Sequence, residues 1–289
     1  MKDLSNIKCI VLSGGGAMFY QMLGIINELI NNNINIDNIT HFYGCSAGSI
    51  LAATLSLGYD FNTLKDYFID RPWHKLVKTD IFQLLSSYNT CGIIGKDIFI
   101  KAYDPLFKGK DMDITTITLK EFYDKTKKEL HIYCTNITDG EIIDLSYITH
   151  PEWLIIDALQ ASACLPTIIV PVIKNNKCYI DGGLINNFPS EYAFKEFDNN
   201  EIIGIKTEAT IETNDTELNF DNILDFLTYI VFKTHSKLMT KRYVRDELEN
   251  IFIIRKDTTD CVDIFSVLNS KDKRNEYFEQ GKIIYAENI

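Results

Sequence analysis

The sequence predicts an α/β fold with a largely parallel central sheet flanked by helices. Short apolar runs typical of buried strands alternate along the chain with longer stretches in which apolar residues recur at helical spacing. No internal repeat, low-complexity tract or Pro/Ser-rich linker divides the 289 residues, and the 46% hydrophobic content suffices for a large core. We therefore expect a single domain over residues 1–289.

The first predicted strand runs into a glycine loop and then into a helix. Ile7–Leu12 is the apolar run, Ser13-Gly14-Gly15-Gly16 ends it, and the pattern is helical from Ala17 to Ile30. This order of strand, glycine loop and helix start points several backbone N–H groups at one place, which favours an anion site.

This loop has four possible interpretations. Three are different kinds of anion site, and the fourth is a tight turn that binds no ligand. A dinucleotide fingerprint fails because Phe19 stands where the third glycine is required. An ATP-type phosphate loop fails because the Gly-Lys-Ser/Thr ending is missing. An oxyanion hole needs only free N–H donors, which Gly15 and Gly16 can supply.

The second predicted strand, residues 39–43, ends in Gly44-Cys45-Ser46-Ala47-Gly48. Glycines on both sides of the serine permit a sharp turn from strand to helix. A helix of small and apolar residues follows, from Ser49 to Leu57. This turn would hold the Ser46 hydroxyl at the head of the helix, near its positive dipole end, where a serine nucleophile is wanted.

Residues 59–129 mix aromatic with charged side chains and predict helices and loops. We expect them to form either a helical cap over the site or part of the outer layer of the fold. For any single aromatic residue in this region, ordinary packing is the simpler interpretation.

The next stretch predicts hairpins around one helix. Residues 130–136 read as a strand that returns over 141–145 through an Asp139-Gly140 turn. The remaining expected elements are a helix over Trp153–Ser162 with Pro151 at its start, a strand over 167–173, a turn at Asn175-Asn176 and a strand over 178–180.

Asp181 closes the last of these strands and is followed by Gly182-Gly183. A carboxylate is costly to bury without a partner, so its position after an apolar strand favours a functional role. The competing interpretation is that Asp-Gly is simply a good turn dipeptide.

The C-terminal third continues the alternation of helices and strands. The expected elements are a helix after Pro189 to about Phe197, a strand over 201–206, a long amphipathic helix over 219–246, a strand over 250–255 and a terminal helix over 277–286.

Composition excludes several functions. The net charge of −11 and the lack of a basic run argue against nucleic-acid binding. Seven scattered cysteines without zinc spacing predict buried free thiols in a reducing, cytoplasmic compartment and no metal site. The apolar run Ile10–Leu12 is too short for a signal peptide or a membrane span, so we expect any membrane contact to be peripheral. The residues indicate no oligomeric state.

Four motifs in order resemble the patatin-like phospholipase family. They are the triplet Gly14-Gly15-Gly16, the elbow Gly44-Cys45-Ser46-Ala47-Gly48, the stretch Ala161-Ser162-Ala163-Cys164-Leu165-Pro166 and the turn Asp181-Gly182-Gly183. The match spans about Ile7 to Pro189. Each motif alone is a weak signal, whereas all four in this order and spacing are a strong one.

The resemblance implies a three-layer fold and a Ser-Asp catalytic dyad. Ser46 would be the nucleophile, Asp181 the base, and Gly14-Gly15-Gly16 the oxyanion loop. Gly44, Gly48, Gly182 and Gly183 would support the motifs. The implied substrate is an acyl ester of a lipid, most simply a phospholipid met at a membrane surface, and the implied reaction needs no metal or organic cofactor.

One departure from the family pattern lies directly after the glycine triplet. Members commonly carry Arg-Gly or Lys-Gly there, whereas this chain has Met18-Phe19. Because backbone N–H groups supply the oxyanion contacts, we expect activity to survive the change.

Two other interpretations remain open. An α/β-hydrolase with a Ser-Asp-His triad requires a histidine after the acid, and His235 is the residue that satisfies this order. A binding or scaffold protein that keeps the fold without the chemistry is favoured only by Met18-Phe19.

Overall fold

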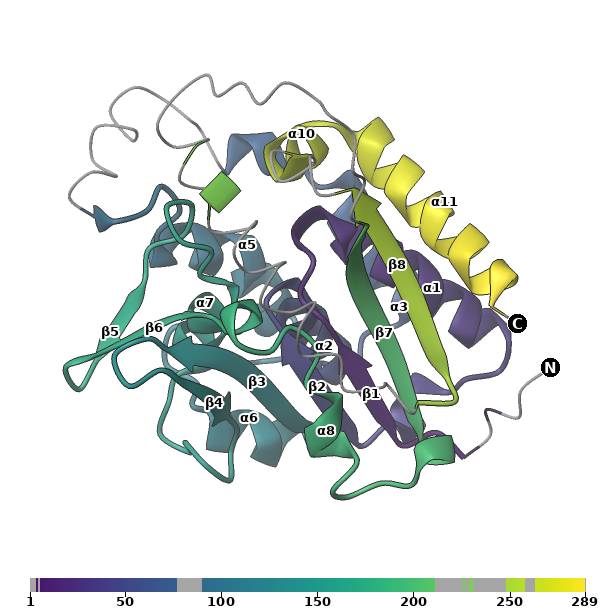
Figure 1. The fold of residues 1–289 in the computed structure, drawn as a ribbon, viewed down its shortest axis with the longest axis horizontal. Helices are drawn as coiled ribbons and strands as arrows, with labels where there is room; N and C mark the ends of the chain where they lie inside the picture. Colours follow the sequence, from purple (N-terminus) through teal and green to yellow (C-terminus); the bar gives the residue numbers. More distant parts are fainter. Residues whose placement is uncertain are drawn as a thin grey trace.

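A mixed sheet runs through the middle of the molecule, with helices packed on it (Figure 1). The computed structural model describes residues 4, 6–76, 90–210, 226, 229–230, 248–257 and 263–288. Within these residues the sheet has eight strands. Seven of them lie in the order β5-β6-β3-β2-β1-β7-β8, and the eighth, β4, pairs with β3 outside this order. The strands are β1 (Cys9–Leu12), β2 (His41–Cys45), β3 (Glu129–Asn136), β4 (Glu141–Leu145), β5 (Val172–Lys174), β6 (Lys177–Asp181), β7 (Ile202–Thr210) and β8 (Ile251–Asp257).

The prediction of a largely parallel sheet is confirmed. Strands β3, β2, β1, β7 and β8 are successive parallel neighbours. Strands β4 and β6 run antiparallel to β3, and β5 runs antiparallel to β6. The hairpin expected at Asp139-Gly140 joins β3 to β4.

Helices follow the strands as the sequence pattern predicts. The α-helices are α1 (Phe19–Asn31), α2 (Ala47–Ser56), α3 (Phe61–Asp70), α5 (Lys96–Lys108), α6 (Leu119–Thr126), α7 (Ile155–Ala163), α8 (Ser190–Ala193), α10 (Asp263–Asn269) and α11 (Lys271–Glu287). Short 3₁₀ turns are η1 (Gly16–Met18), η2 (Ile36–Asn38), η3 (Trp73–Lys75), η4 (Gly182–Leu184) and η5 (Asn199–Glu201).

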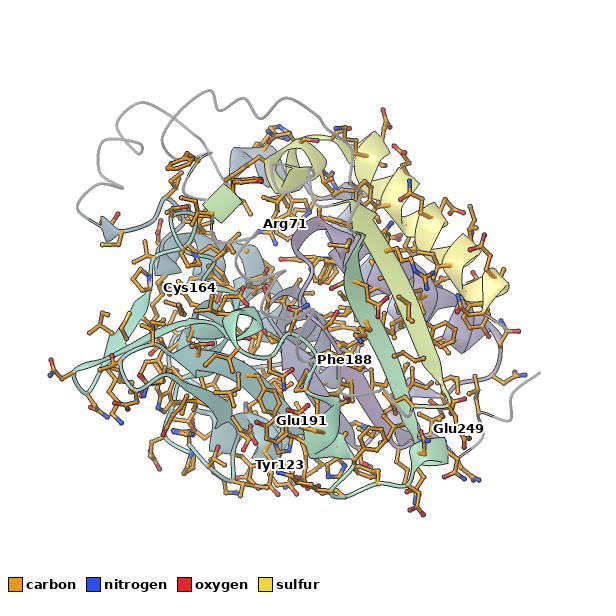
Figure 2. The ribbon with its side chains drawn as sticks, in the orientation of Figure 1. Arg71, Tyr123, Cys164, Phe188, Glu191 and Glu249 are labelled. Atoms are coloured by element: carbon orange, nitrogen blue, oxygen red, sulfur yellow. The ribbon has the colours of Figure 1, made fainter. Side chains whose placement is uncertain are left out.

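Side chains of the sheet alternate between two separate core clusters. In β1, Ile10 and Leu12 enter the larger cluster, which is covered by helices that include α1, α2, α7 and α11. Cys9 and Val11 point to the opposite face and enter the smaller cluster, which Phe188 and the region of α8 cover (Figure 2). Both faces of β1 are therefore buried, as its unbroken apolar sequence requires.

The region from 59 to 129 supplies helices to the larger cluster. Leu64 and Phe68 of α3, Leu106 and Phe107 of α5, and Phe122 of α6 are all buried there. For these residues the expectation of ordinary packing is met. Residues 77–89 of this region lie outside the described residues.

Three elements differ from the sequence prediction in their bounds. The strand expected over 167–173 begins only at Val172, because Thr167 takes a left-handed φ of 74° that interrupts an extended run. The terminal helix begins at Lys271, earlier than expected, since the Ser270 side chain accepts a hydrogen bond from the Lys273 amide and caps it. Helix α8 ends at Ala193, short of the expected Phe197.

The long helix expected over 219–246 lies outside the described residues, apart from 226 and 229–230. His235 falls in the same part of the chain. No helix in the described ranges is long and apolar enough to cross a membrane.

Candidate active site

Two strands that meet end to end bring Ser46 and Asp181 together. On one side, strand β3 pairs with β4 over residues 132–136. On its other side, β3 pairs with β2 over residues 129–133 and then with β6 over residues 134–136. Strand β2 runs parallel to β3 and β6 runs antiparallel to it, so their C-terminal ends face each other. Cys45 is opposite Tyr133 and Asp181 is opposite the next residue, Cys134. The side chain that follows β2 therefore meets the one that ends β6.

The Ser46 hydroxyl donates a hydrogen bond to Asp181. The distance from Ser46 Oγ to Asp181 Oδ2 is 2.7 Å, and the other carboxylate oxygen accepts the Gly183 amide at 2.8 Å. Asp181 is 8% exposed. Burial raises the pKa of this carboxyl to about 6, although the hydrogen bonds from Ser46 and Gly183 act in the opposite direction.

Ser46 occupies a strained turn, as expected for a nucleophile elbow. Its φ of 53° is uncommon for a residue with a side chain, and helix α2 starts at the next residue. A Cβ on Gly48 would lie within 3.0 Å of the Leu12 carbonyl oxygen, so a glycine is required for α2 to approach β1. The other motif glycines, Gly44, Gly182 and Gly183, also lie where a Cβ would come within 3.0 Å of another atom.

Ser162, for which the sequence predicted no role, supports the elbow from helix α7. Its hydroxyl oxygen accepts the Ser46 amide at 2.9 Å and donates to the Tyr133 carbonyl at 2.6 Å. Two residues later, the Cys164 carbonyl accepts the Asp181 amide at 2.9 Å. The stretch from Ala161 to Pro166 thus contacts the backbone of both Ser46 and Asp181, which is a physical reason for the motif.

The three loop glycines have different hydrogen-bonding states. The Gly14 amide donates to the Asn187 carbonyl at 3.1 Å. The Gly15 and Gly16 amides donate to no acceptor in the part of the chain that the structure describes. Gly15 has φ 179° and ψ 3°, a conformation in which its own N–H and that of the next residue converge on one point. Gly16 has a φ of 55°, which favours glycine.

The departure from the family pattern is a packing feature. Met18 and Phe19 are both buried in the larger core cluster. The Phe19 ring packs edge-on against Phe68 of α3, with 4.6 Å between centroids. Apolar contacts between α1 and α3 therefore hold the segment after the glycine loop.

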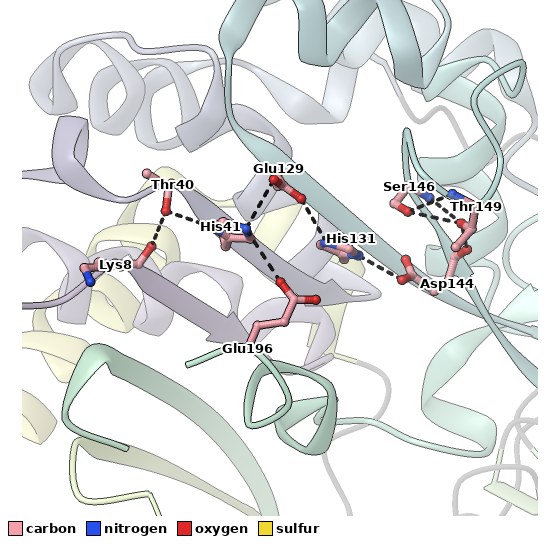
Figure 3. A network of polar contacts seen from close by, with 9 residues as sticks. All are labelled: Lys8, Thr40, His41, Glu129, His131, Asp144, Ser146, Thr149 and Glu196. Carbon is pink, nitrogen blue, oxygen red and sulfur yellow. Dashed lines mark hydrogen bonds and ion pairs between the residues drawn. The ribbon is translucent and has the colours of Figure 1, made fainter. Parts of the chain in front are cut away.

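None of the four described histidines is a hydrogen-bond partner of Asp181. His41 and His131 lie in one polar network between β2, β3 and β4 (Figure 3). The His131 ring contacts Asp144, with 2.8 Å between Nδ1 and Oδ2, and stacks on Tyr43. The described ranges hold no group of three or more His, Cys, Asp or Glu side chains that could bind a metal ion.

The cysteines beside the site are buried thiols. Burial raises the pKa of Cys45 and of Cys164, and the nearby Asp181 adds to both effects. A thiol in this state is a poor nucleophile. Ser46 is therefore the better candidate for attack on a substrate.

Comparison with known proteins gives a family and several relatives. The family model described as patatin-like phospholipase matches residues 10–194. The chain is 35% identical over 191 residues to a protein of Invertebrate iridescent virus 6 named "Probable lipid hydrolase 463L", covering 65% of this chain and 63% of that protein. It is 26% identical over 283 residues to the uncharacterized protein R571 of Acanthamoeba polyphaga mimivirus, covering 96% and 92%. The match thus covers less than two thirds of the length of the iridescent virus protein.

Solved structures share the fold at low identity. VipD from Legionella pneumophila superposes with a TM-score of 0.58 at 19% identity, covering 98% of this chain and 66% of that one. The type III effector ExoU gives a TM-score of 0.50 at 13% identity, covering 98% and 53%. These similarities show a common architecture.

Proposed function

Because the chain belongs to the patatin-like phospholipase family, we propose that it is a lipid acyl hydrolase of the phospholipase A type that uses a Ser46–Asp181 dyad. The observation that carries the proposal is the 2.7 Å hydrogen bond from Ser46 Oγ to a buried carboxylate oxygen of Asp181. A serine hydroxyl becomes a competent nucleophile when a positioned base can take its proton.

The proposed reaction proceeds through an acyl-enzyme. Asp181 takes the hydroxyl proton while Ser46 Oγ attacks the ester carbonyl, and the ester oxygen then leaves as an alcohol or lysolipid after receiving that proton. Water, deprotonated by Asp181, attacks the acyl-enzyme and releases the fatty acid, which regenerates the Ser46 hydroxyl. Each cycle thus consumes one ester and one water.

The converging amides of Gly15 and Gly16 are the proposed oxyanion donors. They suit this role because no described acceptor occupies them, whereas the Gly14 amide is already bonded to Asn187. In comparable enzymes, removal of one such donor costs about 3–4 kcal/mol of transition-state stabilisation. Gly14 then serves to anchor the loop.

The substrate class is proposed from the family and from the name of the iridescent virus relative. Both point to an acyl ester of a lipid, and a phospholipid presented at a membrane surface is the simplest member of that class. A peripheral encounter with the membrane and a reducing, cytoplasmic location complete the proposal. The reaction as written uses no metal or organic cofactor.

The test compares hydrolysis of 4-nitrophenyl butyrate and of mixed phospholipid vesicles by wild type, Ser46→Ala and Asp181→Asn, with a chelator present throughout. We expect turnover in wild type and its loss in both variants. Ser56→Ala and Asp139→Asn are matched controls, since Ser56 bonds only within α2 and Asp139 lies in an exposed turn. Analysis of the released fatty acid and lysolipid identifies the acyl position cleaved.

The other outcomes separate the competing mechanisms. Activity that survives Asp181→Asn but is lost in His235→Ala would replace the dyad with a Ser-Asp-His triad. Folded wild-type protein without turnover on either substrate would favour a binding or scaffold role. Activity that is seen only in a parallel assay without the chelator would exclude the metal-free mechanism.

A further inference from the structure

Three side chains lie within hydrogen-bond distance of the carbonyl oxygen of Gly14, those of Ser13, Asn187 and Thr207, and Ser13 Oγ donates to it at 3.1 Å. Asn187 Nδ2 donates to it at 3.1 Å, and the Thr207 hydroxyl donates to it as well. Asn187 follows the Asp181-Gly182-Gly183 turn, whereas Thr207 lies on β7 just beyond the residues that pair with β1. The Gly14 amide also donates to the Asn187 carbonyl, so this glycine is bonded at both its polar groups.

A second ring of hydrogen bonds fixes the Thr207 hydroxyl itself. Asn187 Nδ2 donates to Thr207 Oγ1 at 3.3 Å and Ser13 Oγ donates to it at 3.2 Å, while the Thr207 amide donates to Ser13 Oγ at 2.8 Å. A hydroxyl has one proton to donate and two lone pairs with which to accept. With its lone pairs facing Asn187 and Ser13, the Thr207 proton is directed at the Gly14 carbonyl.

Fixing this carbonyl also fixes the next amide. The peptide bond between Gly14 and Gly15 is planar and trans, so the carbonyl of Gly14 and the N–H of Gly15 point in opposite directions. A peptide flanked by two glycines meets little steric resistance to rotation as a unit. Its orientation must therefore come from hydrogen bonds rather than from side-chain packing.

We propose that Thr207 and Asn187 are positioning residues that aim the Gly15 N–H at the oxyanion. This inference rests on the proposed function, because the aim of that amide affects a rate only if Ser46 forms a tetrahedral intermediate. Gly14 is close enough to Ser46 for the aim to matter, since a Cβ on Gly14 would lie 2.9 Å from Ser46 Cβ. The two residues touch no reacting atom and act through the loop.

The first arm of the test is kinetic. Thr207→Val removes the hydroxyl and keeps the branched shape, including the methyl group that faces Gly15. We expect kcat on 4-nitrophenyl butyrate to fall about tenfold to a hundredfold, less than the loss on deleting an oxyanion donor outright, with KM unchanged. Thr207→Ser should restore most of the activity. Thr126→Val is the matched control, because Thr126 donates a comparable bond to the Phe122 carbonyl within α6.

The second arm is structural and does not depend on turnover. In crystals of Thr207→Val and of Asn187→Leu we expect the Gly14–Gly15 peptide to rotate or to occupy two orientations. Each variant removes one donor independently, so the proposal stays testable if the other does not fold. An unmoved peptide together with unchanged kcat in both variants would overturn it. A reoriented peptide in a chain whose wild type hydrolyses no ester would refute the proposed function while leaving the anchoring role intact.

Discussion

Replacing the buried carboxylate of Asp181 should make the protein more stable while abolishing its activity. The ordinary pKa of an aspartate is 3.8, and burial raises that of Asp181 to about 6. The folded state therefore binds this proton more tightly than the unfolded state does. The stabilisation from the protonated group is complete below pH 3.8 and is lost as the pH rises through 6.

The size of the effect follows from this difference in pKa. At about 1.4 kcal/mol per pKa unit, the ionised carboxylate costs about 3 kcal/mol of folding free energy at pH 7.5. Asn is neutral at every pH, nearly the same in shape, and its carbonyl can still accept the Gly183 amide. We therefore expect Asp181→Asn to raise Tm by about 5 °C at pH 7.5, with no gain at pH 4.

Thermal unfolding of wild type and Asp181→Asn between pH 4 and 8 measures the effect directly. Asp139→Asn is a control of opposite sign, because hydrogen bonds to Lys177 and Asn136 hold the pKa of Asp139 below its ordinary value. A gain for Asp181→Asn that did not depend on pH, or a loss of Tm at pH 7.5, would refute the assignment of Asp181 as a desolvated carboxylate.

Three further predictions concern rate and stability. The kcat for a soluble ester should rise with pH through about 6, because the ionised form of Asp181 is the proposed base. A pH–rate profile already flat above pH 4.5 would contradict this role. Ser162→Ala leaves the Ser46 amide and a buried carbonyl unpaired, so it should lower kcat and cost about 1–3 kcal/mol of stability in urea unfolding. Arg274→Met should lower the free energy of unfolding by about 3 kcal/mol or more in the same assay, because the buried guanidinium donates to four carbonyls at the ends of α3 and α10. The control Lys282→Met, on the same helix, should change this free energy little, and equal losses in the two variants would contradict the prediction.

The catalytic candidates were predictable from sequence because each sits in a short motif with a local structural signature. Ser46 lies between glycines at a strand-to-helix junction, and Asp181 ends an apolar strand before two glycines. Their contact was not predictable from periodicity, since it depends on β6 running antiparallel to β3 in a register that ends opposite Cys134. Nothing in either local pattern encodes that register.

The supporting residues were harder to predict for a related reason. Thr207 is an ordinary strand residue between Lys206 and Glu208, just after an apolar run, and its proposed role depends on β7 lying beside β1. The sequence predicted free N–H donors at Gly15 and Gly16, but it did not predict the bonds to Asn187 and Thr207 that hold Gly14. A strand was wrongly expected to begin at Thr167, because apolar content gave no sign of a left-handed φ.

The end-to-end meeting of β2 and β6 determines when during synthesis the site can exist. Ser46 is translated 135 residues before the carboxylate that it contacts, and β3, the strand along which both ends align, lies between them. When only the elbow and helix α2 have emerged from the ribosome, the chain contains Ser46 but not yet Asp181. The complete pair arises only after β6 has emerged and paired with β3, so the proposed dyad cannot form before every strand from β1 to β6 has been made.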